Sequence, residues 1–303
     1  MQPLMNVITF FNHAGGVGKS SSVRDVGFTL STLGFRVLLI DADPQANLTD
    51  WLGVRTVERD GQVRDIELED TLYPAVLGDD DSELALPQPV RVHGMDLIPG
   101  HLDVATIEPL LPGQLMGVLR LKDALKPLAD RYDFVLIDPP PSLGQLSALA
   151  VIAADHVVVP VPASGKGLKG LQTVNVMLSR FRKANPSLKL AMILVTQYND
   201  TTNHSRESLA QLHAQFGRLG PVSTPLTYRP ALYPDSQLHG SPLPEFARRN
   251  PVTAEILTVT QQLLTALGLP LEAPAPQKTP ASKAGPRKGS GTVRAAPKAA
   301  KHD

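Results

Sequence analysis

The sequence of 303 residues contains no cysteine. This absence excludes disulfide bonds, thiolate metal sites and cysteine-ligated iron–sulfur clusters. The N-terminal stretch lacks the basic region that opens a signal peptide, and no uninterrupted apolar run approaches the roughly 18 residues of a membrane span. We therefore expect a cytoplasmic protein without a membrane partner.

Net charge is also absent, since 29 basic residues balance 29 acidic ones, but the two signs are unevenly distributed. Residues 271–303 contain seven basic and two acidic residues, and only Leu271 and Val293 as larger aliphatic ones. Such a composition cannot form a core. We predict a folded domain over residues 1–270 and a disordered basic tail over residues 271–303. The tail is either a tether for an anionic partner such as DNA or an appendage without a role.

Strand and helix patterns alternate along the domain, which predicts an α/β fold with a mostly parallel, twisted sheet and helices on both faces. Helices are expected at 19–33 and 252–267, and an irregular segment at 221–251. The pattern is weak at 54–93, where we expect the acidic cluster at 79–81 to form a solvated loop. The predicted strands are 6–11, 35–41, 133–138, 156–161 and 190–196.

The stretch "NHAGGVGKSS" at residues 12–21 has the composition of a phosphate-binding loop. Glycines allow backbone amides to point at phosphate oxygens, and the following helix adds its positive N-terminal dipole. Lys19 would contact the β and γ phosphates, and the Ser20 hydroxyl would bind Mg²⁺. His13 replaces the first glycine of the strict pattern. The candidate nucleotide-binding residues are Ala14, Gly15, Gly16, Val17, Gly18, Lys19, Ser20, Ser21 and, from the irregular segment, Pro225.

Aspartates stand at the ends of two predicted strands. Asp138 ends "VLID" and is expected to hold Mg²⁺ together with Ser20 and Asp43. Asp41 and Asp43 follow another strand, and parallel strands bring their carboxyl ends to one ligand crevice. Asp43 is the candidate for orienting the attacking water, with loop capping as the alternative. The guanine-reading pattern NKxD is absent, which favours ATP as the nucleotide.

These motifs, with "RVLLIDADPQANLTDWLG", "DTLYPAVLG", "MDLIPGHLDVATIE" and "YDFVLIDPPPSLGQLSALAVIAADHVVVPV", resemble the ParA/MinD superfamily of deviant Walker A ATPases. Within it they are most similar to ParA/Soj partition ATPases, and a weaker likeness extends to about Leu267. The resemblance implies an ATP-dependent homodimer that binds nonspecific double-stranded DNA at the nucleoid. It also implies slow ATP hydrolysis, stimulated by a ParB-like partner that causes release from DNA.

The chain departs from that pattern at Ala14, where the family has a signature lysine that reaches the partner's phosphates. McdA-like members, which position a protein cargo, also lack this lysine and use one after the strand that follows Walker B. Lys166 stands at that location. We expect Lys166 to be catalytic together with Lys19 and Asp43. The alternative is that Lys166 is a solvated lysine at the start of a helix, without a role in catalysis.

The sequence leaves the DNA contacts and the cargo open. Arg206, Arg218, Arg248 and Arg249 are candidate DNA-binding residues, and each could instead serve only to solubilise the surface. The cargo could be a chromosome, a plasmid or a protein assembly. Two other functions remain possible, an ATP-dependent small-molecule synthetase on the same fold and a switch that binds ATP without hydrolysing it.

Overall fold

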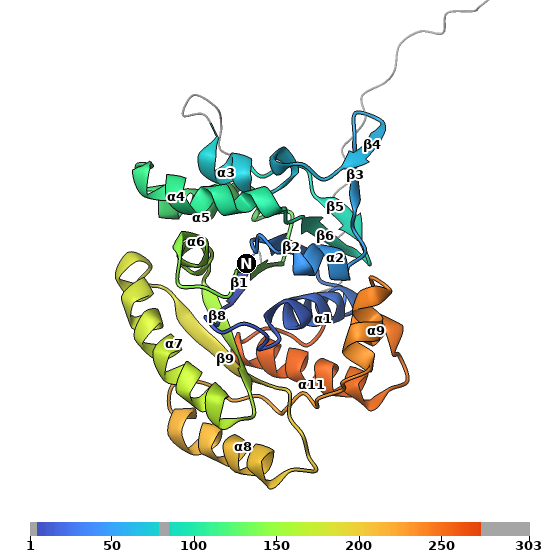
Figure 1. The fold of residues 1–303 in the computed structure, drawn as a ribbon, viewed down its shortest axis with the longest axis vertical. Helices are drawn as coiled ribbons and strands as arrows, with labels where there is room; N and C mark the ends of the chain where they lie inside the picture. The colour runs from blue at the N-terminus through green and yellow to red at the C-terminus, as the bar shows by residue number, and fades with distance from the viewer. Residues whose placement is uncertain (1–4, 79–84, 274–303) are drawn as a thin grey trace, which may run out of the picture. The chain divides into compact units, whose positions relative to one another are not determined.

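The computed structural model describes residues 5–78 and 85–273. Its centre is a seven-stranded sheet in the order β5-β6-β2-β7-β1-β8-β9 (Figure 1), and every neighbouring pair is parallel except β5 with β6. The strands are β1 (Asn6–Phe10), β2 (Val37–Asp41), β5 (Val90–Val92), β6 (Met95–Ile98), β7 (Phe134–Asp138), β8 (His156–Pro162) and β9 (Lys189–Thr196). A separate antiparallel hairpin joins β3 (Thr56–Arg59) to β4 (Gln62–Asp65).

The helices vary from one turn to twenty residues. Four of them, α1 (Lys19–Thr32), α7 (Gly165–Ala184), α8 (Asn203–Phe216) and α11 (Pro251–Ala266), have at least fourteen residues each. The shorter ones are α2 (Asn47–Trp51), α3 (Tyr73–Leu77), α4 (Ile107–Leu110), α5 (Arg120–Leu125), α6 (Gln145–Ala153), α9 (Leu232–Leu238) and α10 (Leu243–Phe246). In the described residues, no helix has the length and apolar composition needed to cross a membrane.

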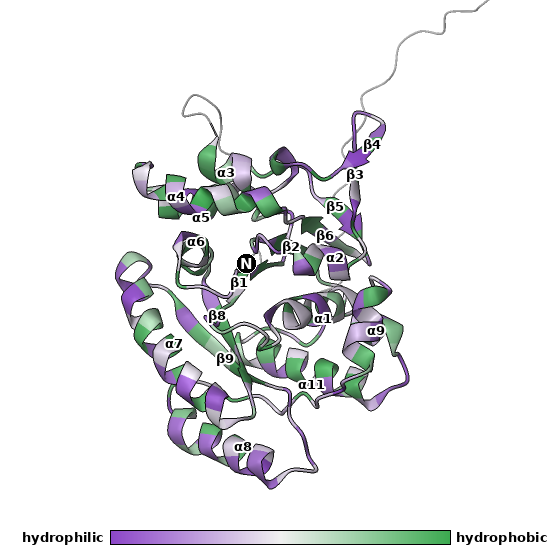
Figure 2. Ribbon diagram, in the orientation of Figure 1, coloured by the Kyte–Doolittle hydropathy of each residue, from purple (hydrophilic) through white to green (hydrophobic). Residues whose placement is uncertain are grey.

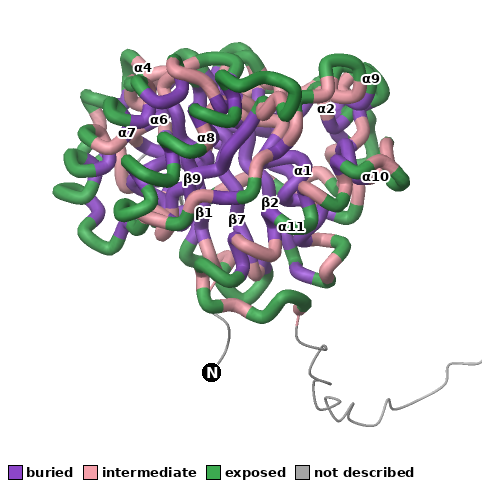
Figure 3. Tube along the Cα trace, turned by 90° about the horizontal axis from the view of Figure 1, so that it is seen from below, coloured by how far each residue is buried: buried purple, intermediate pink, exposed green. Residues whose placement is uncertain are grey.

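Alternating strand residues separate the apolar core into two layers. On β2, Leu38 and Ile40 face one layer while Val37 and Leu39 face the other, as the two-residue repeat of a strand requires. Helices α5, α6, α7 and α8 contribute to the first layer, and α1 and α11 to the second. The central strands are accordingly buried on both faces, with exposed helix surfaces outside them (Figure 3). Hydrophilic and hydrophobic residues alternate along the outer helices α7 and α8 (Figure 2). This arrangement confirms the predicted fold class.

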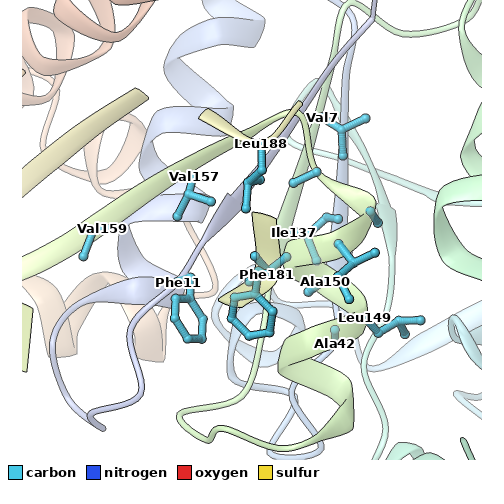
Figure 4. Close-up of a cluster of buried hydrophobic side chains, with 14 of the residues drawn as sticks. Val7, Phe11, Ala42, Ile137, Leu149, Ala150, Val157, Val159, Phe181 and Leu188 are labelled. Carbon is cyan, nitrogen blue, oxygen red and sulfur yellow. The ribbon is translucent and has the colours of Figure 1, made fainter. Parts of the chain in front are cut away.

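Aromatic packing in the first layer joins the phosphate loop to α7. The rings of Phe11, just after β1, and Phe181 on α7 meet edge to face, with centroids 5.7 Å apart and an interplanar angle of 86° (Figure 4). Both side chains are buried. Edge-to-face pairs of this kind contribute about 0.5–1.5 kcal/mol beyond their buried area. The contact fixes the start of the loop against the helix that carries Lys166.

The predicted elements all form, with ends within two residues of the expected ones. Other elements were not predicted, among them α2, α4, α5, α6 and α8. The weak segment 54–93 contains the β3–β4 hairpin and edge strand β5, and the irregular segment 221–251 contains α9 and α10. Strand β6 was not anticipated either. The acidic cluster at 79–81 and almost all of the tail 271–303 lie outside the described residues, although the Ala273 amide still donates to the Leu33 carbonyl at 2.9 Å.

A glycine in the first turn of α7 is required by close approach to β8. A Cβ atom added at Gly167 would lie 2.2 Å from the Pro162 carbonyl oxygen, a backbone atom that cannot yield by side-chain rotation. We expect Gly167→Ala to lower the free energy of unfolding by about 1–3 kcal/mol in urea denaturation. Gly170→Ala is the matched control, because its nearest neighbour would be 4.0 Å away and alanine favours a helix. Equal stability of the two variants would contradict the steric argument.

Candidate phosphate-binding site

The loop between β1 and α1 is closed by hydrogen bonds to its own carbonyl groups. Lys19 Nζ donates to the Ala14 carbonyl at 3.2 Å, Thr196 Oγ1 to the Val17 carbonyl at 2.9 Å, and Gln197 Nε2 to the Gly16 carbonyl. Gly16 and Gly18 have φ values of 68° and 90°, in the left-handed region that favours glycine. These carbonyl groups already accept hydrogen bonds, and the first amides of α1 have no acceptors within the helix. The loop and the start of α1 therefore present free N–H donors to an anion.

The N-terminal side of the loop is braced by Asn12. Its side chain donates to the Pro160 carbonyl at 2.8 Å and accepts from the Ala14 amide at 3.0 Å. The loop is thereby attached to β8 as well as to the end of β9.

Asp41 and Asp138 are direct partners across the β2–β7 pair, so two buried carboxylates stand side by side at the carboxyl edge of the sheet. Asp41 is engaged in the loop that follows β2. Its Oδ2 accepts from the amide and the hydroxyl of Thr49 at 2.9 and 2.7 Å, and its Oδ1 accepts from the Asp43 amide at 3.2 Å. Burial, opposed by the hydrogen bonds from Thr49, raises the pKa of Asp41 to about 7.

Asp138 differs from Asp41 because neither of its buried carboxylate oxygens has a hydrogen-bond partner of good geometry in the described part of the chain. Burial and the charge of Asp41 raise the pKa of Asp138 well above its ordinary value, while the nearby Ser20 hydroxyl and Lys19 oppose the rise. A buried acceptor without a partner needs a cation or donor. The site therefore has the chemistry for a hard divalent cation.

Asp43 lies at the surface of a cavity of about 330 Å³ that also contains the glycine loop, Lys19 and Ser20. Burial lowers the pKa of Lys19, and the charges of Asp138 and Asp43 oppose this. In the described residues, no group of three or more acidic or histidine side chains could bind a metal alone. Magnesium commonly uses one or two protein carboxylates and completes its shell with phosphates and water, so Ser20, Asp43 and Asp138 fit such an ion.

The outer wall of the cavity was not anticipated from the sequence. It consists of Asn47 and Trp51 on α2, the segment 226–230, and Tyr233, Pro234 and Gln237 on or beside α9. Only the single tryptophan and the tyrosines of "TYRPALYP" could have indicated it, and they have no recognisable spacing. Pro225 directly precedes this wall and is not part of the cavity lining, and neither are Ala14 and Val17 within the loop.

The remaining candidates lie outside the cavity. Lys166 is exposed in the first turn of α7, beyond the end of β8 and therefore at the same edge of the sheet as the loop. Arg206 on α8, Arg218 just after it, and Arg248 and Arg249 between α10 and α11 are exposed. The four arginines come from two separate segments, so the structure does not gather them on one element.

The Walker-type loop between a central strand and a helix, with acidic residues at the ends of β2 and β7, defines a P-loop nucleotide-binding protein. A sequence profile of the family described as "AAA domain" matches residues 5–190. The chain belongs to the ParA/MinD-type P-loop ATPases.

Three relatives illustrate the membership. The chain is 41% identical over 234 residues to the probable plasmid-partitioning protein ParA of Thermus thermophilus, covering 75% of this chain and 68% of that protein. Its fold matches Cyanothece apo McdA with a TM-score of 0.72 and 25% identity, covering 87% and 100% of the two chains. It also matches Mycobacterium smegmatis cobyrinic acid a,c-diamide synthase with bound ADP and magnesium, with a TM-score of 0.64, 30% identity and coverage of 78% and 92%.

The Asp41 carboxylate predicts a pH dependence of stability. Its pKa of about 7 in the folded state exceeds the value of about 3.9 expected in the unfolded chain. The folded state therefore retains the proton longer, and the contribution of Asp41 becomes less favourable as pH rises from about 4 to about 7. Asp41→Asn should remove this decline, which amounts to at most about 4 kcal/mol.

The measurement is urea unfolding of nucleotide-free protein in a chelator across pH 4.5–8. Asp50→Asn, on exposed Asp50 of α2, is the control and should follow the wild-type curve. A pH profile of Asp41→Asn that runs parallel to the wild type would show that Asp41 does not titrate in this range.

Proposed function

We propose that the chain is an ATP-hydrolysing partition or positioning protein that binds ATP with Mg²⁺, dimerises on ATP and holds nonspecific DNA until a ParB-like partner stimulates hydrolysis. The observation that carries the proposal is Asp138, whose buried oxygens have no hydrogen bond of good geometry from the described residues, beside Ser20 below the phosphate loop. The relatives named ParA and McdA support the partition or positioning class. The ADP and magnesium of the M. smegmatis structure support the ligands.

Each residue of the site has a chemical role in this proposal. Lys19 would exchange its contact with the Ala14 carbonyl for phosphate oxygens, which restores a full charge interaction to a buried ammonium group. Ser20, Asp138 and Asp43 would hold Mg²⁺, which neutralises phosphate charge when bound. Asp43 would also orient the attacking water, since its Oδ1 is held by the Gln45 amide at 3.0 Å and it faces the cavity.

The proposed dimer would bring the carboxyl edges of two sheets together. Lys166 after β8, Leu102 after β6 and Leu143 after β7 stand at that edge, and the two leucines are 64% and 48% exposed. Lys166 is not part of its own chain's cavity lining, which supports action on the nucleotide of the partner subunit.

The proposal also covers the cargo and the surface that would bind DNA. Chromosome or plasmid DNA is the preferred cargo because of the ParA relative, and a protein assembly is the alternative because of McdA. Nucleoid association would follow from Arg206, Arg218, Arg248 and Arg249. A synthetase function is the second candidate, favoured by the name of the M. smegmatis relative.

DNA retention by the full-length protein tests the switch. We expect retention at near-physiological salt with ATP and Mg²⁺, and little with ADP or without nucleotide, because only the ATP dimer doubles the set of phosphate contacts. Arg206→Ala with Arg218→Ala, and separately Arg248→Ala with Arg249→Ala, should reduce the salt dependence if those pairs contact phosphates. Arg131→Ala, an exposed arginine outside these segments, is the control.

Equal retention in all three nucleotide states would contradict a nucleotide switch and assign binding to basic residues alone. Absence of retention in every state would contradict the DNA-binding function. In that case, phosphate release dependent on a small-molecule substrate and independent of DNA would establish the synthetase alternative.

A mixing experiment tests whether Lys166 acts across the dimer. We expect Lys166→Ala to lower stimulated hydrolysis at least about 100-fold, because one charge on the transferring phosphoryl group is lost. Lys169→Ala, an exposed lysine on the same helix, should retain activity. Mixing Lys166→Ala with the inactive Lys19→Ala variant should restore hydrolysis, since the mixed dimer has one complete site. Failure to restore it, with mixed dimers demonstrated, would exclude action in trans.

A further inference from the structure

A buried ion pair on α1 has no part in binding phosphate. Arg24 is fully buried and pairs with Asp25, with Nε to Oδ1 at 2.8 Å and Nη2 to Oδ2 at 3.3 Å. It follows Lys19 by five residues on the same helix. Removing two charges from water is costly, and a well-packed apolar pair of similar volume is often equally stable. A contribution to stability alone therefore does not account for the pair.

Arg24 bonds to α9, which contributes to the outer wall of the nucleotide cavity, and Asp25 bonds to the start of α10, which follows α9 in the chain. Arg24 Nη2 donates to Ser236 Oγ at 3.0 Å, and Ser236 Oγ in turn donates to the Tyr233 carbonyl at 2.9 Å within α9. Asp25 Oδ1 accepts from the Leu243 amide at 2.9 Å, where α10 begins. The helix that starts at the phosphate loop is thus joined by side-chain hydrogen bonds to the segment that closes the far end of the cavity.

The wall held in this way includes Tyr233 and Gln237. Burial and the negative charge of Asp25 raise the pKa of Tyr233, so its phenol remains neutral. Arg24 Nη1 is buried and has no hydrogen-bond partner among the described residues. Among the described residues, Ser236 is therefore the one hydrogen-bond partner that Arg24 has outside its own helix.

We propose that the Arg24–Asp25 pair is a positioning pair that fixes α9 at the distance from the phosphate loop that a nucleoside triphosphate requires. The inference rests on the proposed ATP-binding function. It adds residues that affect binding of the nucleoside part of ATP and not binding of its phosphates. In the proposed function the phosphates would be bound by the glycine loop and the start of α1, before the pair, whereas Tyr233 and Gln237 come from the element that the pair holds. Loss of the pair should consequently weaken binding of the nucleoside and leave binding of the phosphates intact.

The test compares two ligands on the full-length Arg24→Met variant. Trp51, the only tryptophan, lies in the cavity lining and reports binding by its fluorescence. We expect the dissociation constant for ATP, with Mg²⁺, to rise about tenfold or more, because breaking a buried pair leaves an uncompensated charge. The constant for inorganic tripolyphosphate should change by less than about twofold. Ser236→Ala should alter ATP binding in the same direction by a smaller factor.

Arg59→Met is the matched control for a general loss of structure. Arg59 Nε pairs with the buried Asp70 at 2.8 Å, on the β3–β4 hairpin side and outside the cavity lining. It should reduce stability and leave both dissociation constants unchanged. If Arg24→Met does not fold, the double variant Arg24→Met with Asp25→Leu replaces both charges by apolar groups, and the same selective loss is expected from it.

Three results would overturn the inference. An equal loss for ATP and tripolyphosphate would show a structural role for the pair, and unchanged ATP affinity in folded variants would show no role at all. Binding of tripolyphosphate but not ATP by the wild type would contradict both this inference and the proposed ATP function. A different result would distinguish the inference from the proposed function. If the wild type binds ATP but does not retain DNA, and Arg24→Met selectively loses affinity for ATP, the positioning pair is supported and the DNA-binding function is contradicted.

Discussion

The structure depends on a backbone loop that must direct its amides toward an anion while its carbonyls are satisfied elsewhere. An unpaired buried carbonyl is unfavourable, so each of these groups needs a donor from outside the loop. Lys19, Thr196 and Gln197 supply those donors, and Asn12 attaches the loop to β8. The parallel order β7-β1-β8-β9 is what brings residues nearly two hundred positions apart to the same few carbonyl groups.

The parallel strand order also places two negatively charged side chains next to each other. The register of β2 with β7 places Asp41 beside Asp138, and burial makes the pair unfavourable without a cation. The two carboxylates differ in their hydrogen bonds. Asp41 uses hydrogen bonds from Thr49 and shapes the loop that bears Asp43, whereas Asp138 keeps both oxygens free of hydrogen bonds of good geometry in the described residues. One aspartate is a structural anchor and the other is a candidate ligand.

The sequence predicted the central strands because buried strands of a parallel sheet appear as continuous apolar runs, such as Phe134–Asp138. It also predicted α1 and α11, but not α8. The glycine loop and the convergence of Asp41 and Asp138 followed from the same pattern. The short helices α9 and α10 were missed, because prolines and polar residues conceal any helical period in "LYPDSQLHGSPLPEF". The outer wall of the cavity was missed with them. Arg24 and Asp25 could not be identified either, since charged residues in a predicted helix are ordinarily placed on its exposed side.

The bonds from Thr196 and Gln197 have a mechanical consequence. They make the last residue of β9 and the first residue beyond it part of the phosphate loop, and only residues 198–202 separate this point from the start of α8. Thr202 caps that helix by accepting from the Ser205 amide, so the connection has little slack. The covalent path from the phosphate loop to the helix that bears Arg206 is therefore short and fixed by hydrogen bonds at both ends.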